Sequence, residues 1–327
     1  MELQELLNKL PKLKPNRNYW FVRTNGGDLY DQFLQNGYVA IGWDKISLGD
    51  IAKSKTGNNT GIKVLKEIVK NKYQDENRPG HSASQLFKFA YEIKKDDIVI
   101  IPSQGSREIS FGEILKTPAY IETNTNYFQK RKSVKWLETT TRDNLDPNLF
   151  KLMFSHHTIS EAGLYEDYID KEINSFFIKG QRAHLVLGVQ ATNDIKARDL
   201  FEMGTLSLDL LDEFAKSHNV NVDSQNINVK LNVQSPGQIE LSGLDMGGIV
   251  ILALIFLFIV GGGAEISFGE KFKLNLKTDG IIEKVRMFIK SGTENKIKKE
   301  ILKKHLRDLK IKDPDELLKI LKQIENE

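Results

Sequence analysis

The amino-acid sequence predicts an α+β fold, and three observations lead to this prediction. Short segments rich in aromatic and β-branched residues, bounded by Asn-Gly turns, alternate with segments of helical periodicity. The length of 327 residues accommodates two domains of ordinary size. One late segment, Met246 to Ala264, carries no charge in a sequence of which 28% is charged. We therefore expect two α+β domains, the second of which contains one strongly apolar helix.

The first expected domain covers residues 18–158. Its expected strands have the sequences NYWFVRT (18–24), YVAIGWD (38–44), DDIVIIPS (96–103) and REISFGEIL (107–115). Helices are expected at residues 62–72 and 84–93, and the Asp-Pro signal in DNLDPNLFKLMF predicts a short capped helix at 143–154.

The second expected domain covers residues 184–280. Strands are expected at residues 184–194, 226–233 and 238–243, and a helix at 207–217. The segments AEISF and KFKLNLK, after residue 263, alternate apolar and polar residues again, so the apolar helix 246–264 is expected between strands. Three further parts complete the expected organisation: an amphipathic helix at 1–17, a polar connector at 159–183 and a basic helical tail at 281–327.

The composition narrows the class of function. A formal net charge of +3 excludes a molecule that is polycationic as a whole. The charge is uneven, however, because Lys290–Lys312 contains nine Lys and Arg residues against three acids. The absence of cysteine excludes disulfides, thiolate nucleophiles and cysteine-based zinc sites. The chain opens with a charged, amphipathic segment that lacks a secretory pattern.

Several side chains of the first domain suit a nucleotide or nucleic acid. Arg23 precedes the turn Asn25-Gly26-Gly27, which places a cation beside backbone N–H groups and suits phosphate. Trp43 provides a face for base stacking, Gln85 an amide for base edges, and Arg107 a cation for phosphates. A basic cluster around Arg131 is a candidate groove for the ligand backbone.

The same residues also have ordinary structural explanations. Trp43, Phe87, Phe89 and Phe111 have the character of core residues, and the basic cluster has that of a solvated surface.

A family resemblance favours the ligand-binding interpretation. The segments FVRTNGGDLYDQFLQNGYVAIGWD, SASQLFKFAYEIKKDDIVIIPSQGSREISFGEI and KRKSVKWLETTTRDNL resemble the EVE/PUA-like domain found ahead of Mrr-type restriction endonucleases. The resemblance covers residues 19 to about 155 and implies a PUA-like β-barrel with an aromatic pocket for a nucleobase or a short strand. The pocket positions that it implies are Arg23, Asn25, Trp43, Gln85 and Arg107. Asn25 departs from the family pattern, in which Gly or Glu is common, and this leaves the ligand's identity open.

Signatures of catalysis are missing from the sequence. The second domain has no acid followed downstream by the Glu/Gln-x-Lys pattern of an Mrr-type nuclease. The pair His156-His157 lacks spaced carboxylate partners, and Gly261-Gly262-Gly263 lacks the lysine of a phosphate-binding loop. We therefore expect no enzymatic activity, no catalytic residues, no metal and no cofactor.

The apolar segment has three interpretations. It is a transmembrane helix, a re-entrant or triggered membrane helix, or a core helix buried by oligomerisation. Of the twenty residues before Gly247 one is basic, against four of the twenty after Ala264, so a single span conflicts with a cytoplasmic first domain. The expected membrane or oligomer contacts of the segment are Gly248, Leu254, Phe256, Phe258 and Gly262.

The layout of sensor domain, apolar helix and basic tail is similar to that of membrane effectors of bacterial anti-phage defence, the Hailong type among them. That resemblance implies an ion-conducting effector restrained by short DNA oligomers. The predicted function is a homo-oligomeric effector that senses a nucleotide or single-stranded nucleic acid and permeabilises the membrane. Its expected partners are the ligand, membrane lipid and a nucleotidyltransferase or other defence protein that makes the ligand. Its expected location is the bacterial inner membrane, or the cytoplasm before triggered insertion. The alternative is a cytosolic DNA-binding or restriction-type module with a buried oligomerisation helix.

Overall fold

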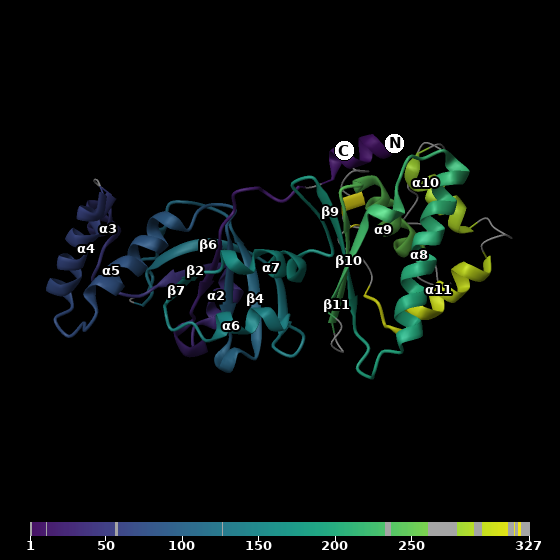
Figure 1. Ribbon diagram of the computed structural model, residues 1–327. Helices are drawn as coiled ribbons and strands as arrows, with labels where there is room; N and C mark the ends of the chain where they lie inside the picture. The colour runs from purple at the N-terminus through teal and green to yellow at the C-terminus, as the bar shows by residue number, and fades with distance from the viewer. Residues whose placement is uncertain are drawn as a thin grey trace. The chain divides into compact units, whose positions relative to one another are not determined.

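The computed structural model has an α+β fold and divides into two compact units (Figure 1). The N-terminal unit comprises Asn16–Ile173, and the C-terminal unit comprises Met1–Pro15 together with Asn174–Glu327. The structure describes residues 2–10, 12–55, 58–125, 127–232, 237–260, 280–290, 296–312, 317 and 320–321.

The N-terminal unit is built around one curled sheet. Its order is β2-β6-β4-β3-β1-β7, and β5 pairs with β6. The strands are β1 (Tyr19–Val22), β2 (Tyr38–Ile41), β3 (Ile98–Pro102), β4 (Glu108–Ile114), β5 (Tyr120–Ile121), β6 (Lys130–Thr141) and β7 (Ile159–Glu161). The helices are α2 (Tyr30–Asn36), α3 (Leu48–Ala52), α4 (Asn58–Lys72), α5 (Pro79–Phe87), α6 (Phe150–Met153) and α7 (Glu166–Ile173).

The long strand β6 gives the sheet its curl. Its first residues pair with β2, and the residues from Val134 onward pair with β4. A register shift between Phe111 and Gly112 of β4 marks an irregularity of the kind that bends a strand. A Cβ atom on Gly112 would lie 2.4 Å from Val134 Cγ1 and 2.6 Å from Trp136 Cε3, so the close approach of the two strands requires glycine there.

Strand β1 is buried on both of its faces. Tyr19 and Phe21 of β1 pack into one apolar cluster, and the alternate residues Trp20 and Val22 pack into another. This alternation follows from the period of two in a strand. Because both sets are apolar, β1 reads as a continuous apolar run, as expected of a strand covered on both sides.

Three helices, α3, α4 and α5, form an insertion between β2 and β3 (Figure 1). A capping box begins α3, in which the backbone N–H of Asp50 donates to the hydroxyl of Ser47 and the Asp50 carboxylate accepts the N–H of Ser47. Lys72 at the end of α4 lies 2.6 Å from Asp50 and joins the two helices. This ion pair is the first cause of the lowered pKa of the Asp50 carboxyl.

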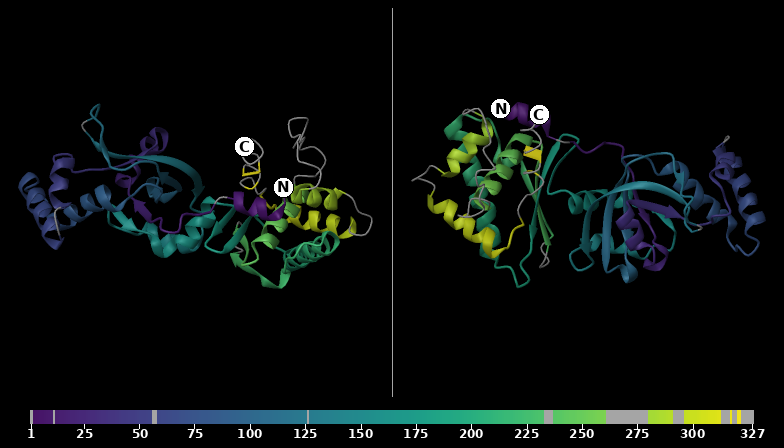
Figure 2. Two further views of the ribbon diagram at one scale, coloured as in Figure 1. Left: turned by 90° about the horizontal axis from the view of Figure 1, so that it is seen from above. Right: turned by 180° about the vertical axis from the view of Figure 1, so that it is seen from behind.

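The C-terminal unit combines a four-stranded antiparallel sheet with helices. The sheet order is β10-β11-β9-β8. Its strands are β8 (Phe176–Lys179), β9 (Arg182–Val189), β10 (Ile227–Asn232) and β11 (Gly237–Gly243). Its helices are α1 (Leu3–Lys9), α8 (Ala197–His218), α9 (Met246–Val260), α10 (Ile281–Lys290) and α11 (Lys296–Asp308), and Figure 2 shows α1, in purple, beside the helices from the other end of the chain.

The apolar helix α9 is the centre of the C-terminal unit. It contacts β9, β11, α1, α8, α10 and α11, and every residue from Ile249 to Phe256 is 0% exposed. Leu254 and Phe256 are thus fully buried, Gly248 packs beside Asp245 and Leu211, and Phe258 is partly buried. The chain itself removes this helix from water. That corrects the expectation that only a membrane or an assembly would cover it. Gly262 and the strands expected after residue 263 lie outside the described residues.

The described part of α9 matches the first 15 residues of the expected apolar segment, and residues 261–264 lie outside the described residues. These 15 residues span about 22 Å at about 1.5 Å per residue, less than a bilayer core of about 30 Å. No helix in the described part of the chain is both long enough and apolar enough to cross a membrane.

Most expected strands and helices are confirmed, and two regions differ. The strands expected in the first domain occur as β1 to β4, and Asp146 caps the short helical turn before α6 by accepting the N–H of Asn148. The segment 159–183, expected as a polar connector, contains β7, α7 and β8 instead. The expected helix 207–217 is the second half of the longer α8.

Candidate functional site

A sharp turn at the end of β2 carries Trp43, whose side chain is partly buried and packs against the core of the unit. Trp43 has a φ of 55°, a left-handed conformation that a bulky residue rarely adopts. Its carbonyl oxygen accepts the N–H of Ile46 at 2.9 Å, which closes the turn. Its indole N–H donates to Glu76 Oε2 at 3.1 Å, and the ring is only partly buried. The indole is therefore held at one edge by the insertion. Strain of this kind is commonly found at functional sites.

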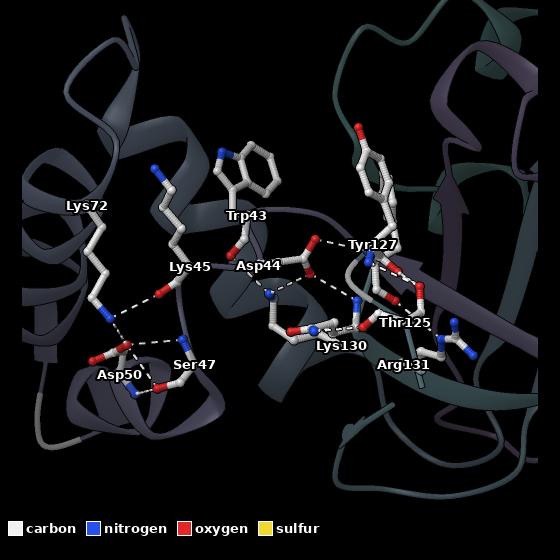
Figure 3. Close-up of polar contacts among 12 residues, drawn as sticks. Trp43, Asp44, Lys45, Ser47, Asp50, Lys72, Thr125, Tyr127, Lys130 and Arg131 are labelled. Carbon is white, nitrogen blue, oxygen red and sulfur yellow. Dashed lines mark hydrogen bonds and ion pairs between the residues drawn. The ribbon is translucent and has the colours of Figure 1, made fainter. Parts of the chain in front are cut away.

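The next residue, Asp44, ties this turn to the loop that precedes β6 (Figure 3). Its two carboxylate oxygens accept the backbone N–H groups of Phe128 at 3.0 Å and Gln129 at 2.9 Å. The side chain of Asp44 is nevertheless 25% exposed. A carboxylate at this position fixes the loop and still faces solvent.

A buried lysine, Lys130, donates hydrogen bonds to both Trp43 and Asp44. Lys130 is 1% exposed, and its ammonium donates to the carbonyl oxygen of Trp43 at 3.0 Å and to Asp44 Oδ1 at 3.4 Å. Burial lowers the pKa of Lys130, and the nearby Asp44 carboxylate opposes that shift. Lys130 thus fixes the positions of both residues of the turn.

The loop before β6 carries a second aromatic ring. Tyr127 is 71% exposed, and Figure 3 shows its ring and that of Trp43 projecting on either side of Asp44. Thr125 fixes the backbone of Tyr127 by accepting its N–H at 3.1 Å. Behind the loop, Arg131 stacks over Tyr38 at 4.0 Å from the ring centroid and donates from Nε to the carbonyl oxygen of Phe128 at 3.3 Å.

The arrangement joins two aromatic faces, a partly exposed carboxylate and nearby cations. Aromatic faces stack on planar rings, and a carboxylate accepts hydrogen bonds from amino groups. Lys45, exposed beside Trp43, adds a positive charge, with its ammonium 5.3 Å from the centroid of Tyr73. This cluster, made of Trp43, Asp44, Lys45, Tyr127 and Lys130, is called the Trp43 corner below.

The six predicted ligand contacts do not form one site. β2 runs antiparallel to β6, β6 to β4 and β4 to β3, while β3 is parallel to β1. It follows that β1 and β2 run in opposite directions and that the residues after them lie at opposite ends of the sheet. Trp43 and Arg131 lie at one end. Arg23 follows β1 at the other.

Two of the remaining predicted contacts, Asn25 and Arg107, are exposed near Arg23. Arg107 precedes β4, and its carbonyl oxygen accepts the N–H of Arg142 just beyond the far end of β6. Asn25 lies in a glycine turn that packs on a second one, where a Cβ on Gly27 would lie 2.4 Å from Gln104 Cα. Both side chains are accessible, and neither is near Trp43.

Arg23 and Gln85 form structural hydrogen bonds at the end of the sheet opposite Trp43. The guanidinium of Arg23 donates to the carbonyl oxygens of Ser155 at 2.6 Å and Met153 at 3.4 Å. Gln85 is 4% exposed, and its amide oxygen accepts the N–H of Ile159 at 2.6 Å. These groups are used within the unit, so we leave both residues out of the site.

The structural explanation noted for the aromatic residues holds fully for two of them and in part for the other two. Phe89 and Phe111 are 0% exposed and belong to the core, whereas Trp43 and Phe87 are partly buried and pack against it. Lys132, which belongs to the basic cluster around Arg131, is also 0% exposed, and its ammonium donates to the carbonyl oxygen of Ile93 at 2.9 Å. Both interpretations of the cluster, a binding groove and a solvated surface, required this side chain to be exposed. Burial lowers the pKa of Lys132 to about 8.

Sequence reasoning missed Asp44, Tyr127 and Lys130. Asp44 directly follows the predicted Trp43, and a polar residue after a strand and turn was a usable signal. The role of Tyr127 depends on the long-range pairing of β2 with β6, which the sequence alone does not reveal. Among the residues that the structure describes, no three His, Asp or Glu side chains converge to hold a metal ion.

Two comparisons with known proteins found a match, and each covers less than half of the chain. A family model described as "Domain of unknown function (DUF8426)" matches residues 20–162, less than half of the chain. The chain is 28% identical over 130 residues to the "Intermediate transcription factor 3 large subunit" of Monkeypox virus (strain Zaire-96-I-16). That alignment covers 38% of this chain and 34% of the viral protein, so the chain matches about a third of its relative's length. No solved structure matches the chain.

Proposed function

We propose that the N-terminal unit binds a nucleobase of a nucleotide or single-stranded nucleic acid at the Trp43 corner. The observation that carries the proposal is the placement of Trp43 and Tyr127 on either side of the partly exposed Asp44 (Figure 3). Stacking of a base on an aromatic ring contributes about 1–3 kcal/mol and tolerates any base. The resemblance to EVE/PUA-like domains supports the same class of ligand. The β-barrel that it implies is part of the proposal.

Asp44 gives the site a chemical preference. Its carboxylate can accept only. Oδ1 accepts from Gln129 and Lys130 and Oδ2 from Phe128, which leaves a lone pair of Oδ2 for a ligand. Exocyclic amino groups of adenine, cytosine and guanine are donors, whereas thymine and uracil lack such a group. We therefore expect amino-bearing bases to bind more tightly than thymine or uracil.

The test is equilibrium binding of nucleoside monophosphates and of a fluorescein-labelled oligonucleotide to the full-length protein. Trp43→Ala and Tyr127→Ala are each expected to weaken binding by roughly 5- to 150-fold, the loss of one stacking partner. Phe154→Ala removes an aromatic side chain that is 67% exposed, and it is the matched control with unchanged affinity.

Two results would overturn the proposal. One is the absence of any measurable binding by the folded wild type. The other is an equal affinity of Trp43→Ala, Tyr127→Ala and the Phe154→Ala control. Asp44→Asn provides a finer readout, because it should reduce the preference for amino-bearing bases while the stacking surfaces stay in place.

The membrane-permeabilising activity and the restriction-type alternative stay predictions, as do the homo-oligomer and the partner that supplies the ligand. Membrane permeabilisation would require α9 to leave the apolar core of the C-terminal unit. Dye release from liposomes by the wild-type protein, with and without oligonucleotide, measures the membrane activity. Metal-dependent cutting of DNA without dye release would favour the restriction-type alternative.

A further inference from the structure

Three lysines form a stripe on α4, the helix whose last turn contacts Lys45 of the Trp43 corner. Lys63, Lys66 and Lys70 are spaced i, i+3 and i+7, so they share one face of the helix, and all three are exposed. No hydrogen bond or ion pair is formed by these three side chains within the described part of the chain. The sequence of α4 contains a single acid, Glu67.

Direct contacts connect this helix to the base site. Lys72, in the last turn of α4, donates to the carbonyl oxygen of Lys45 at 3.0 Å. The hydroxyl of Tyr73, the next residue, accepts the N–H of Lys45 at 2.9 Å. Trp43 itself donates to Glu76. The C-terminal end of α4 is thus fixed against the turn that presents Trp43, and Lys70, the last lysine of the stripe, lies two residues before Lys72.

The dimensions and charge of the stripe fit the backbone of a nucleic acid strand. Seven residues separate Lys63 from Lys70, which corresponds to about 10 Å along the helix axis. That is roughly the axial length of three nucleotides at about 3.4 Å each in a base-stacked strand. A mononucleotide held at Trp43 has phosphates at one point only, so it would leave most of the stripe unused.

We infer that the ligand of the Trp43 corner is a single-stranded oligonucleotide whose phosphates lie along Lys45, Lys70, Lys66 and Lys63. This inference rests on the proposed base site and names its ligand class. The insertion α3–α5 supplies the phosphate contacts, and the turn and loop at the sheet's end supply the stacking contacts. Binding is expected to be salt-dependent, because each phosphate contact releases counterions.

The experiment compares three full-length proteins by fluorescence anisotropy over a range of salt concentrations. The probe is a labelled single-stranded DNA of about twelve nucleotides, within the site sizes of about 4–16 nucleotides that single-strand-binding folds cover. The proteins are the wild type, the triple variant Lys63→Gln/Lys66→Gln/Lys70→Gln and the matched control Lys116→Gln/Lys135→Gln/Lys151→Gln. The control removes the same charge from exposed lysines elsewhere in the N-terminal unit.

The α4 variant is expected to lose tenfold or more in oligonucleotide affinity at low salt. Its plot of log affinity against log salt should be shallower by about 2, since each contact to a single strand contributes about 0.7. Its affinity for nucleoside monophosphates should change less than twofold. The control should retain the wild-type slope. Comparing the affinity for an RNA oligonucleotide of the same sequence shows whether the protein distinguishes ribose from deoxyribose.

Failure of this inference can be distinguished from failure of the base site. If the wild type binds mononucleotides and the α4 variant keeps the wild-type slope with the oligonucleotide, the lysine stripe is not a backbone contact and the base site stands. An equal loss of slope in the α4 variant and the control would also overturn the inference, because the effect would then be one of net charge. If Trp43→Ala leaves all binding unchanged, the base site itself fails.

Discussion

Two segments, α9 and the start of β6, are both buried, although they have opposite compositions. α9 is uncharged along its whole length, and its central residues are 0% exposed. The start of β6 contains Lys130 and Lys132, which are 1% and 0% exposed. An apolar side chain is buried without any specific partner, whereas each lysine needs an acceptor for its ammonium. Burial thus has a different physical basis in the two segments.

The difference lies in what a substitution would do. In the middle of α9, from Ile249 to Phe256, a polar side chain would be placed among the apolar side chains that surround this part of the helix. In β6 the acceptors are already fixed: the carbonyl oxygens of Trp43 and Ile93, and the carboxylate of Asp44. A charged side chain would therefore destabilise the middle of α9. The two lysines of β6 stay buried as long as their acceptors stay in place.

Leu254→Lys is the largest expected perturbation. It places an ammonium where no acceptor exists, and we expect it to lower the free energy of unfolding of the C-terminal unit by about 5 kcal/mol or more. Urea unfolding of the full-length protein, followed with limited proteolysis, measures the loss. Leu254→Met, a swap of similar volume, should cost less than about 1.5 kcal/mol. A C-terminal unit that resists protease as well in Leu254→Lys as in the wild type would contradict the role assigned to α9.

Lys132→Met should have an intermediate and pH-dependent effect. The pKa of Lys132 falls from 10.5 to about 8 on folding, so the unfolded chain holds more protons between these values and wild-type stability rises with pH in that window. Below pH 8 the cost of the buried charge is fully present, at roughly 3 kcal/mol. Lys132→Met removes this cost but also loses the hydrogen bond to Ile93, which contributes about 1 kcal/mol. The net expected gain in stability is the difference between the two.

Urea unfolding at pH 7 and pH 10.5 tests this prediction. We expect Lys132→Met to be more stable than the wild type at pH 7, and this advantage to disappear at pH 10.5. Lys135→Met, at an exposed position of the same strand, is the control without pH dependence. An advantage of equal size at both pH values would show that packing, and not the buried charge, causes the effect.

Asp44→Asn is expected to have the smallest effect of the three on stability. Asparagine keeps one acceptor oxygen for the loop but removes the negative charge beside Lys130. We expect a loss of about 1.5 kcal/mol, the lower end of the contribution of a hydrogen bond to a charged group. The unfolding midpoint in urea measures it. A wild-type midpoint would mean that the Lys130 ammonium is held by the carbonyl oxygen of Trp43 alone.

The sequence predicted where the strands and helices lie better than it predicted which of them pack together. The aromatic and β-branched residues in β1 to β4 and the uniform apolarity of α9 are local signals, and these elements occur where they were expected. What covers α9 could not be predicted, because its neighbours come from both ends of the chain. The segment 159–183 is polar overall, yet apolar residues such as Ile169 and Phe176 are buried in it, so its average composition was misleading.

The candidate site was predictable only in part. Trp43 was identified from its position at the end of a strand, and it lies in the site. Arg23 and Arg107 were grouped with it because they are polar residues at turns. The direction of each strand, and hence the end of the sheet where each turn lies, depends on long-range pairing. The same pairing brings Tyr127 to Trp43, which no local pattern indicates.

The C-terminal unit takes α1 from one end of the chain and the rest of its core from the other. Leu6 of α1 is 0% exposed in the same core as α9. During translation α1 leaves the ribosome first, and roughly ten to thirty seconds pass at about 5–20 residues per second before residue 174 is made. For that interval the helix has no native partner. A bulky tag fused directly to α1 would therefore interfere with the part of the protein that is synthesised last.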